Sequence, residues 1–345
     1  YHAEAPFRQW TDADLAISRT DRSGVPRLDE ARSSDYASVF AENVFRLPHR
    51  IHIVPSVRFD HETIAIDESA RPPFLTRPLI NETVTRSVPL FGIGIGNDFG
   101  HQNETYFNVS QGWRPVRYFD VASPFSNLQP GNVADPSKSL SYELGVHGTP
   151  VTGLYYDASL FWIDFKNRIE TQHINATDVI NVNTGDTRHR GFEGTASYDF
   201  LARANNGAHL EIFASIQLLN ARFTGSGNPA QIGKIPAFAP RYLFKGGITW
   251  RADKRYKIAL TATSVASQYW QDSDASGGSG DGFLPAKIPA YTVFDLAGDW
   301  QIAPKLRLLG GISNLGDRRY YDRIFSTGLE PALGRTIYGG ASVSF

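Results

Sequence analysis

The chain has 345 residues, with 34 Lys and Arg against 35 Asp and Glu, and a formal net charge of -1 at pH 7. This balance, without a long run of basic residues, argues against a nucleic-acid partner. The absence of cysteine excludes disulfides, thiolate metal sites and a cysteine nucleophile. No stretch approaches 18 consecutive apolar residues, so no transmembrane helix is predicted, although membrane strands can alternate apolar and polar residues.

The dominant local pattern has a period of two residues, which indicates strands with one apolar face. In the segment around residue 57, Val57 and Phe59 alternate with Arg58 and Asp60. The same alternation recurs along the chain and predicts thirteen strands. They are expected at residues 35–46, 50–66, 88–97, 103–113, 138–148, 152–172, 179–201, 208–224, 241–252, 254–271, 290–302, 305–323 and 335–345.

The connections between these strands alternate between short turns and long polar segments. Aromatic residues bracket several strands, as Tyr242 and Trp250 do, and Tyr291 and Trp300 do. Short turns at one rim, long loops at the other and aromatic residues at both interfaces are typical of an outer-membrane barrel. The pattern therefore predicts an all-β fold, an antiparallel transmembrane β-barrel.

The strand count predicts that the sequence is part of a longer chain. Bacterial single-chain barrels have an even number of strands, and an open sheet would leave unpaired backbone groups in lipid. The sequence has no methionine, and Tyr1 is therefore not a translation start. We expect further strands before residue 1, in a chain that has been processed or is a fragment.

Four segments in order resemble the TonB-dependent outer-membrane receptors, and among them the ferric citrate and siderophore receptors. They are Lys138-Ser-Leu-Ser-Tyr-Glu-Leu-Gly145, Arg190-Gly-Phe-Glu-Gly194, Ile312-Ser-Asn-Leu-Gly-Asp-Arg-Arg-Tyr-Tyr321 and the terminal strand from Arg335 to Phe345. Each motif alone is weak, because glycine-aromatic strand entries occur in many barrels. Their order and the final phenylalanine make the resemblance more specific, and it covers residue 35 to the C-terminus.

The resemblance implies a barrel of about 22 strands, of which this sequence would hold about 13, without the plug domain or the TonB-binding segment. Residues 1–34 would be an extracellular loop and the end of a truncated strand, and residues 35–345 the C-terminal portion of the barrel. The implied function is import of a ferric siderophore or ferric citrate across the bacterial outer membrane, energised through TonB. The implied partners are the ferric chelate, TonB, the outer membrane and the barrel assembly machinery, with no enzyme activity and no cofactor.

An anionic chelate favours arginine and aromatic residues at the extracellular mouth, because guanidinium groups pair with carboxylates in a bidentate way. For each candidate, the alternative is a salt bridge of the barrel wall or a solvated loop charge. No histidines show metal-ligand spacing, so no protein metal site is expected. The candidate ligand-binding residues are Arg114, Arg117, Tyr118, Arg188, Arg190, Arg323 and Arg335.

The last strand carries a second kind of signal. Ile337, Gly339, Ala341, Val343 and Phe345 share one face by alternation. A final aromatic residue on that face resembles the signal that the barrel assembly machinery reads, so Phe345 is predicted to be an assembly signal. The alternative is an ordinary last strand of a soluble sheet.

Three other functions remain open at this point. An outer-membrane barrel enzyme would need a catalytic set such as Ser, His and Asp, and no Gly-x-Ser-x-Gly motif occurs. A passive porin should close with an even number of strands from this chain alone. A soluble β-sandwich binding module would not need thirteen alternating strands with the long loops at one rim.

Overall fold

The protein was analysed as a computed structural model. The structure describes residues 2–10, 26–100, 102–124, 126–131, 133–175, 178–204, 207–252, 255–277, 284–325 and 328–344. Within these ranges, no helix has the length and apolar character needed to cross a membrane. The helical elements among them are short: α2 at Tyr118–Val121 and the 3-10 turns η1 at Pro48–Arg50 and η2 at Pro229–Gln231.

Among the described residues, the main sheet contains thirteen strands of eight or more residues, which is the number predicted from the sequence. They are β3 (Pro26–Glu42), β5 (Ile51–Ala70), β6 (Asn81–Gly100), β7 (Asn103–Arg114), β9 (Ser137–Gly148), β10 (Leu154–His173), β11 (Asp178–Asp199), β12 (His209–Gly225), β13 (Tyr242–Ala252), β14 (Tyr256–Val265), β17 (Tyr291–Ala303), β18 (Leu306–Ser313) and β21 (Thr336–Val343).

Shorter strands complete the sheet or decorate its loops. β1 (His2–Glu4), β2 (Phe7–Trp10), β4 (Phe45–Leu47) and β8 (Asn127–Leu128) join the main sheet. Two small hairpins stand apart from it, and both lie in long connections. One pairs β15 (Gln268–Tyr269) with β16 (Lys287–Ile288), and the other pairs β19 (Tyr321–Phe325) with β20 (Gly328–Pro331).

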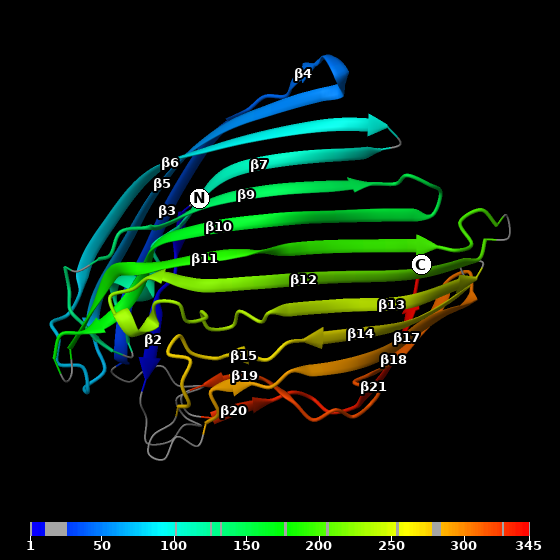
Figure 1. Cartoon of the computed structure of the whole chain (residues 1–345). Coiled ribbons are helices and arrows are strands. Elements are labelled where there is room, and N and C mark those ends of the chain that lie inside the picture. Colours follow the sequence, from blue (N-terminus) through cyan, green and yellow to red (C-terminus); the bar gives the residue numbers. More distant parts are fainter. Residues whose placement is uncertain are drawn as a thin grey trace.

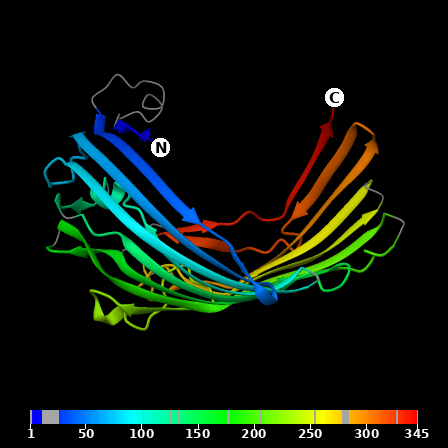
Figure 2. The ribbon, with the colours of Figure 1, turned by 90° about the horizontal axis from the view of Figure 1, so that it is seen from above.

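The long strands pair antiparallel with their neighbours in chain order, as Figure 1 shows. Seen from above, the sheet is a deep trough with the N-terminal and C-terminal strands at its two opposite edges (Figure 2). β1 and β2 pair with β3 at one edge, and β21 pairs with β18 at the other. No separate plug domain is evident within the described ranges.

Several boundaries differ from the sequence-based prediction. β3 begins at Pro26, nine residues before the predicted start at residue 35, because β1 and β2 extend the pairing beyond that point. β5 continues to Ala70, beyond the predicted end at residue 66, and β6 begins at Asn81, before the predicted start at residue 88. The connection between them is therefore shorter than predicted. The predicted strand 305–323 is divided, because β18 ends at Ser313 and β19 belongs to a loop hairpin.

Cross-strand register sorts the side chains of the sheet into two faces. On one, which we call the inner face, Ser56 lies opposite Gly92, and Gly92 lies opposite Ser110. On the other, the outer face, Ile95 lies opposite Phe107. Leu160 on β10 and Ile248 on β13 belong to the outer face and are 57% and 46% exposed. A face of exposed aliphatic and aromatic residues that continues across many strands is what a bilayer requires.

Aromatic residues gather near the rim that carries the short turns. Tyr256 stacks on Trp300 with their ring centroids 5.9 Å apart, and Tyr198 meets Phe200 edge to face at 4.7 Å. Trp250 of β13 also lies on the outer face, opposite Ile258 of β14, which is two residues from Tyr256, and it is half-exposed. These side chains form one of the two aromatic girdles predicted from the sequence.

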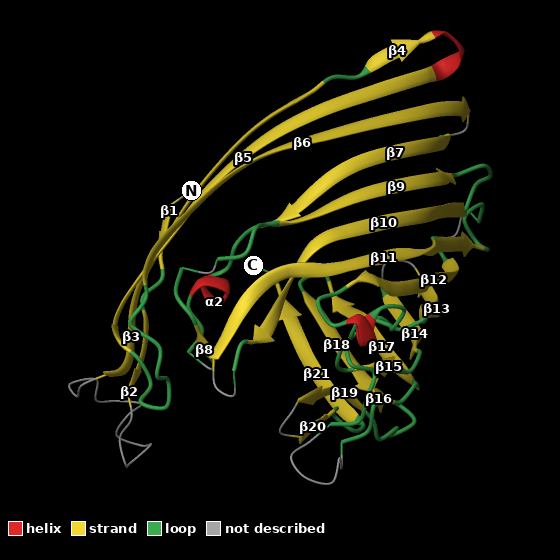
Figure 3. Cartoon of the chain, turned by 60° about the vertical axis from the view of Figure 1, so that its left-hand side comes forward, coloured by secondary structure: helices red, strands yellow, loops and turns green. Residues whose placement is uncertain are grey.

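The buried core lies where the long loops fold onto the sheet. Ile64 and Ile66 of β5 pack with Ile80 and Val84 around β6 and with Val116 and Val121 from the segment after β7. Figure 3 shows the loops, with α2 among them, gathered at the ends of the strands opposite the short turns. A second small core joins Leu284, Ile288 and Ile324 in the connections around β16 and β19. The described parts of these connections are therefore packed against the sheet or against one another.

Candidate ligand-binding site on the inner face

A polar pocket of about 840 Å³ lies on the inner face over β3, β5, β6 and β7. The alternation of β5 places Arg58 and Asp60 on this face, beside Ser38 of β3. Asp60 is 1% exposed and is the centre of the pocket's hydrogen-bond network. Its Oδ1 accepts hydrogen bonds from Ser38 Oγ at 2.7 Å and from Arg58 Nε at 2.6 Å, and its Oδ2 accepts one from Trp113 Nε1 at 2.7 Å.

This network holds Arg58 in a defined position. The Nε of Arg58 is shared between Asp60 and Ser38, and its Nη2 donates to the hydroxyl of Tyr36. Its side chain is nevertheless 49% exposed, and its Nη1 donates no hydrogen bond to any described residue. A guanidinium group held by a buried carboxylate and open to the interior can bind a carboxylate or another anion in the lumen.

Two contacts hold the segment after β7 against the inner face of β5. The backbone N–H of Val116 donates to Glu62 Oε2 at 3.1 Å, one inward position along β5 from Asp60. Val121 at the end of α2 and the following Ala122 belong to the same hydrophobic core as Ile64 and Ile66 of β5. The pocket is therefore bounded at one end by a folded loop.

Three of the predicted site residues lie close together at the end of β7 and in this loop, and two of them, Arg114 and Arg117, bind the carboxylate of Asp120. Arg114 Nη1 donates to Asp120 Oδ2 at 2.8 Å, and Arg117 Nη2 donates to Oδ1 at 3.0 Å. Burial raises the pKa of Asp120, but the hydrogen bonds from Arg117 and Arg114 outweigh it and leave this pKa lowered. Tyr118 packs against the core, and its ring lies 5.3 Å from the guanidinium carbon of Arg32. Arg117 remains 68% exposed and can reach a ligand at the mouth.

A buried ion pair fixes the neighbouring loop between β5 and β6. Arg77 donates from Nη1 and Nη2 to Glu68 Oε2 and Oε1 at 2.6 and 2.7 Å, and both side chains are fully buried. Glu68 also accepts from the backbone N–H of Ile80, and Arg77 Nη2 reaches the carbonyl of Ser123 at 3.4 Å. The pair therefore joins β5, its following loop and the segment that carries α2.

Arg188 and Arg190 lie elsewhere. By register both belong to the outer face, opposite Asp164 and Trp162 of β10. Arg188 Nε donates to Asp164 Oδ1 at 2.7 Å and lies over the ring of Trp162. A ligand that passes through the lumen would not contact them from this side of the sheet.

Arg323 and Arg335 lie in the last long connection and are both exposed. Arg323 faces Glu330 in the register of the β19–β20 hairpin, and Arg335 Nε donates to the carbonyl of Leu315. No recorded contact joins these two arginines to the other predicted residues. Their role as ligand contacts stays a prediction, and Phe345, the predicted assembly signal, lies outside the described residues.

The sequence analysis did not single out the pocket around Arg58. The alternation had placed Arg58 and Asp60 on the polar face of their strand, which was the available signal. Tyr36 and Trp113 could not be added from the sequence, because the contact of Trp113 with Asp60 spans 53 positions. The described part of the chain contains no group of three or more His, Asp or Glu side chains suited to a metal ion.

Comparison with known proteins places the chain among membrane receptors. The model of the family "TonB dependent receptor-like, beta-barrel" matches residues 2–315. The ferric enterobactin receptor of Pseudomonas aeruginosa is 24% identical over 98% of this chain and 48% of its own length. The ferrienterobactin receptor of Escherichia coli K12 is 22% identical over 88% of this chain and 39% of its own.

Among solved structures, the ferric citrate transporter FecA in its unliganded form matches with a TM-score of 0.73 and 20% identity, over 94% of this chain and 47% of that one. The chain spans less than half of the length of the curated relatives it matches. The family match covers most of the chain, and the trough of antiparallel strands has the corresponding fold. The chain belongs to the TonB-dependent receptor-like β-barrel family, whose members are proteins of the Gram-negative outer membrane.

Proposed function

We propose that the whole protein imports a ferric siderophore or ferric citrate and that Arg58 on the inner face contacts this ligand in the lumen. The observation that carries the proposal is the geometry of Arg58, which Asp60, Ser38 and Tyr36 hold in place while its side chain remains 49% exposed. Ferric citrate and many ferric siderophore complexes are anionic, so a positioned guanidinium group is a suitable contact.

The relatives support iron as the cargo, since the curated ones are named as ferric enterobactin and ferrienterobactin receptors. Among the similar solved structures, FecA is titled a ferric citrate transporter and Fiu a ferric-catecholate import receptor. The pocket on the inner face, about 840 Å³, is large enough to hold a substantial part of a chelate of this kind. The selection between citrate and catecholate ligands would depend on the loops.

We assign the first contact of the ligand to the extracellular loops. Arg117 is the best-exposed basic group of the cluster around Asp120, and Arg323 and Arg335 extend the basic surface on the last connection. In this proposal the ligand binds the loops first and Arg58 afterwards. The part of the chain from Pro26 onward would form the C-terminal portion of a larger barrel, since β3 begins there and not at the predicted residue 35. β1 and β2, which pair with β3, would be the end of the preceding strand.

We further propose that TonB energises this import in the whole protein and that the chain has no enzymatic activity. The family match is the support for the first statement, and the naming of the relatives as receptors is the support for the second. Passive diffusion through a porin is the main alternative. A porin would conduct its solute without TonB, and a barrel enzyme would convert the ligand.

The test uses the full-length receptor, expressed in a bacterial strain that lacks its own iron-chelate receptors. Uptake of ⁵⁵Fe is measured separately with citrate and with enterobactin, in cells with and without TonB. The proposal expects saturable, TonB-dependent uptake of at least one chelate, with the chelate recovered unaltered. Uptake that is equal without TonB would favour a porin, and a processed ligand would favour an enzyme.

A further inference from the structure

A second pocket, of about 700 Å³, lies on the outer face over β10, β11 and β12. The strand register arranges the outward-facing residues in and beside the pocket in three parallel rows; Trp162, Asp164 and Arg188 lie beside it, and the other six line it. The first row is Leu160, Phe192 and Leu218; the second is Trp162, Arg190 and Asn220; the third is Asp164, Arg188 and Arg222. The surface therefore changes from apolar to basic along the strands, in the direction of the long loops.

The basic part of this surface has more arginine than acidic side chains, so it carries a net positive charge. Arg188 and Arg222 lie directly opposite each other across β11 and β12, an arrangement of like charges that destabilises a sheet. Asp164 pairs with Arg188. Among the described residues, no ion pair is recorded for Arg190 or Arg222, nor for Arg241, which lines the same pocket from the following loop.

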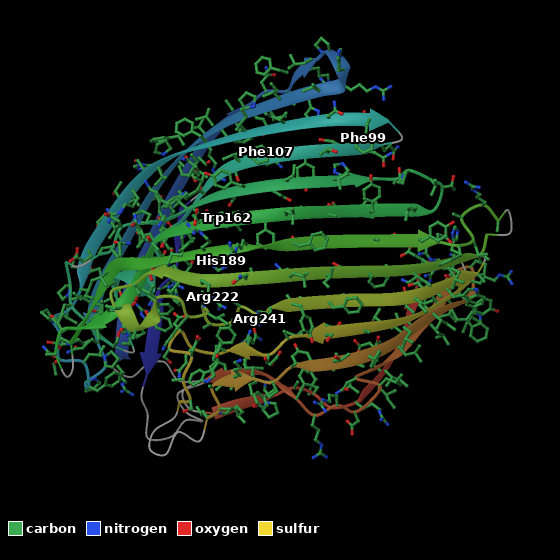
Figure 4. All side chains as sticks on the ribbon, viewed as in Figure 1. Phe99, Phe107, Trp162, His189, Arg222 and Arg241 are labelled. Carbon is green, nitrogen blue, oxygen red and sulfur yellow. The ribbon has the colours of Figure 1, made fainter. Side chains whose placement is uncertain are left out.

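The position of these arginines along the membrane normal is close to that expected for lipid headgroups. Tyr198, in the aromatic girdle of the short-turn rim, lies eight residues from Arg190 along β11. At about 3.3 Å per residue this is roughly 26 Å along the strand, or about 20 Å along the membrane normal for a strand tilted by about 40°. The apolar band of an outer-membrane barrel is about 25 Å tall, so Arg190 stands near its outer boundary. Figure 4 labels Trp162, Arg222 and Arg241 over this part of the sheet.

The rest of the pocket suits an acyl chain. Leu160 and Leu218, on either side of Phe192, are about half-exposed and form a continuous apolar floor below the arginines. Ile235 and Ala239, from the connection between β12 and β13, line the pocket as well. A molecule that fills this site would place hydrocarbon against the floor and an anionic group among the arginines.

We propose that this outer-face pocket binds a phosphorylated glycolipid of the outer leaflet, with a phosphate held by Arg190 and Arg222 and an acyl chain on Leu160, Phe192 and Leu218. The outer leaflet of this membrane is built from acylated diglucosamine lipids that carry phosphates. Guanidinium groups bind phosphate through paired, charge-assisted hydrogen bonds. A bound phosphate would also relieve the repulsion between Arg188 and Arg222.

The test is native mass spectrometry of the full-length receptor with two defined lipids, a hexa-acylated diglucosamine lipid with two phosphates and the same lipid without phosphates. The double variant Arg190→Gln/Arg222→Gln removes two positive charges from the pocket. The matched control Arg203→Gln/Arg255→Gln removes two from exposed arginines at the short turns after β11 and β13. Heat-dependent mobility on a gel checks that each variant is folded.

The expected result is retention of the phosphorylated lipid by the native receptor and the control, with a loss of roughly tenfold or more in affinity for the double variant. The lipid without phosphates should bind weakly to all three. Inorganic phosphate alone should not displace the lipid, because the acyl chain contributes to binding. If the double variant does not fold, Arg241→Gln, on the loop, should still weaken binding.

Two results would overturn the proposal. One is equal retention of the lipids with and without phosphates by the native receptor. The other is retention of the phosphorylated lipid by a folded Arg190→Gln/Arg222→Gln receptor at the level of its control.

Discussion

The indole Nε1 of Trp113 donates a 2.7 Å hydrogen bond to Oδ2 of Asp60, joining the end of β7 to the middle of β5. One inward position further along β5, Glu62 accepts a hydrogen bond from the backbone of Val116. The carboxylates of β5 thus position two things: Arg58 on the lumen side and the loop that begins after β7. The candidate ligand contact, Arg58, and the folded loop are therefore both held by carboxylates of β5.

Replacing Trp113 with phenylalanine should destabilise the barrel by about 1–3 kcal/mol beyond the effect of the smaller ring, because a buried carboxylate loses one of its donors. The free energy of unfolding in detergent, followed by denaturant titration, measures this loss. Trp300→Phe is the control, since Trp300 stacks on Tyr256 on the outer face. Equal losses for both variants would contradict a special role for the Asp60 contact.

Replacing Arg77 with methionine should cost about 3–5 kcal/mol in the folding of the extracellular loops, because it leaves the buried Glu68 carboxylate without its partner. Limited proteolysis of the segments 71–80 and 115–136 measures the effect locally. Lys166→Met removes the partner of Asp186 in an exposed pair and should cost about 0–1 kcal/mol. Protection that survives Arg77→Met would show that the pair does not hold the loops together.

The loop around α2 should loosen in acid. The pKa of Asp120 is lowered in the folded state, so its contribution to stability is complete above the ordinary value of 3.8 and is lost as the pH falls below it, through the lowered pKa. The hydrogen-exchange protection factors of residues 115–122, which compare each rate with its intrinsic value at the same pH, should therefore stay high from pH 7 to about pH 4 and fall at lower pH. In the Asp120→Asn variant, the same backbone amides should lose their protection from exchange already at pH 7. A native loop whose protection falls between pH 7 and pH 5 would contradict this assignment.

Gly145 should be intolerant of even a methyl group. A Cβ there would lie 2.3 Å from Cζ of Tyr106, whose hydroxyl donates to Glu143. Gly145→Ala should displace the ring, break this hydrogen bond and cost about 1–3 kcal/mol. Gly339→Ala on β21 is the control, because the nearest atom to its Cβ would be 3.8 Å away. Similar unfolding free energies for the two variants would show that Tyr106 can move without cost.

The number and order of long strands could be predicted because the bilayer imposes a period of two on every strand. The start of β3 could not, because β1 and β2 lie before a connection outside the described residues and their pairing is long-range. The loops were predicted only as polar segments. Their cores, such as the contact of Val121 with Ile64, depend on pairs of residues that no local pattern links.

The pocket around Arg58 was not predicted, and the roles of the predicted arginines stay predictions, but strand parity already indicates which face of the sheet an arginine occupies. Arg190 has the parity of Phe192 and Tyr198, which face outward, so the alternation already placed it on the outer face. Arg58 has the parity of Asp60, on the polar face. The alternation was used to assign the apolar residues to a face, but not the arginines. Used for the arginines as well, it would have shown that Arg190 faces away from the lumen. The partners of Arg58 still required the structure.

In the proposed function, the whole protein takes up a ferric chelate through a lumen in which Arg58 contacts the ligand. The most direct measurement is TonB-dependent ⁵⁵Fe-chelate uptake by cells with the native full-length receptor and with its Arg58→Gln variant, at equal surface amounts. Because one charge-assisted contact is worth about 1.5–3 kcal/mol, we expect roughly a tenfold to hundredfold weaker apparent affinity in the variant. Uptake by Arg58→Gln with unchanged affinity, in cells where the native receptor requires TonB, would contradict it.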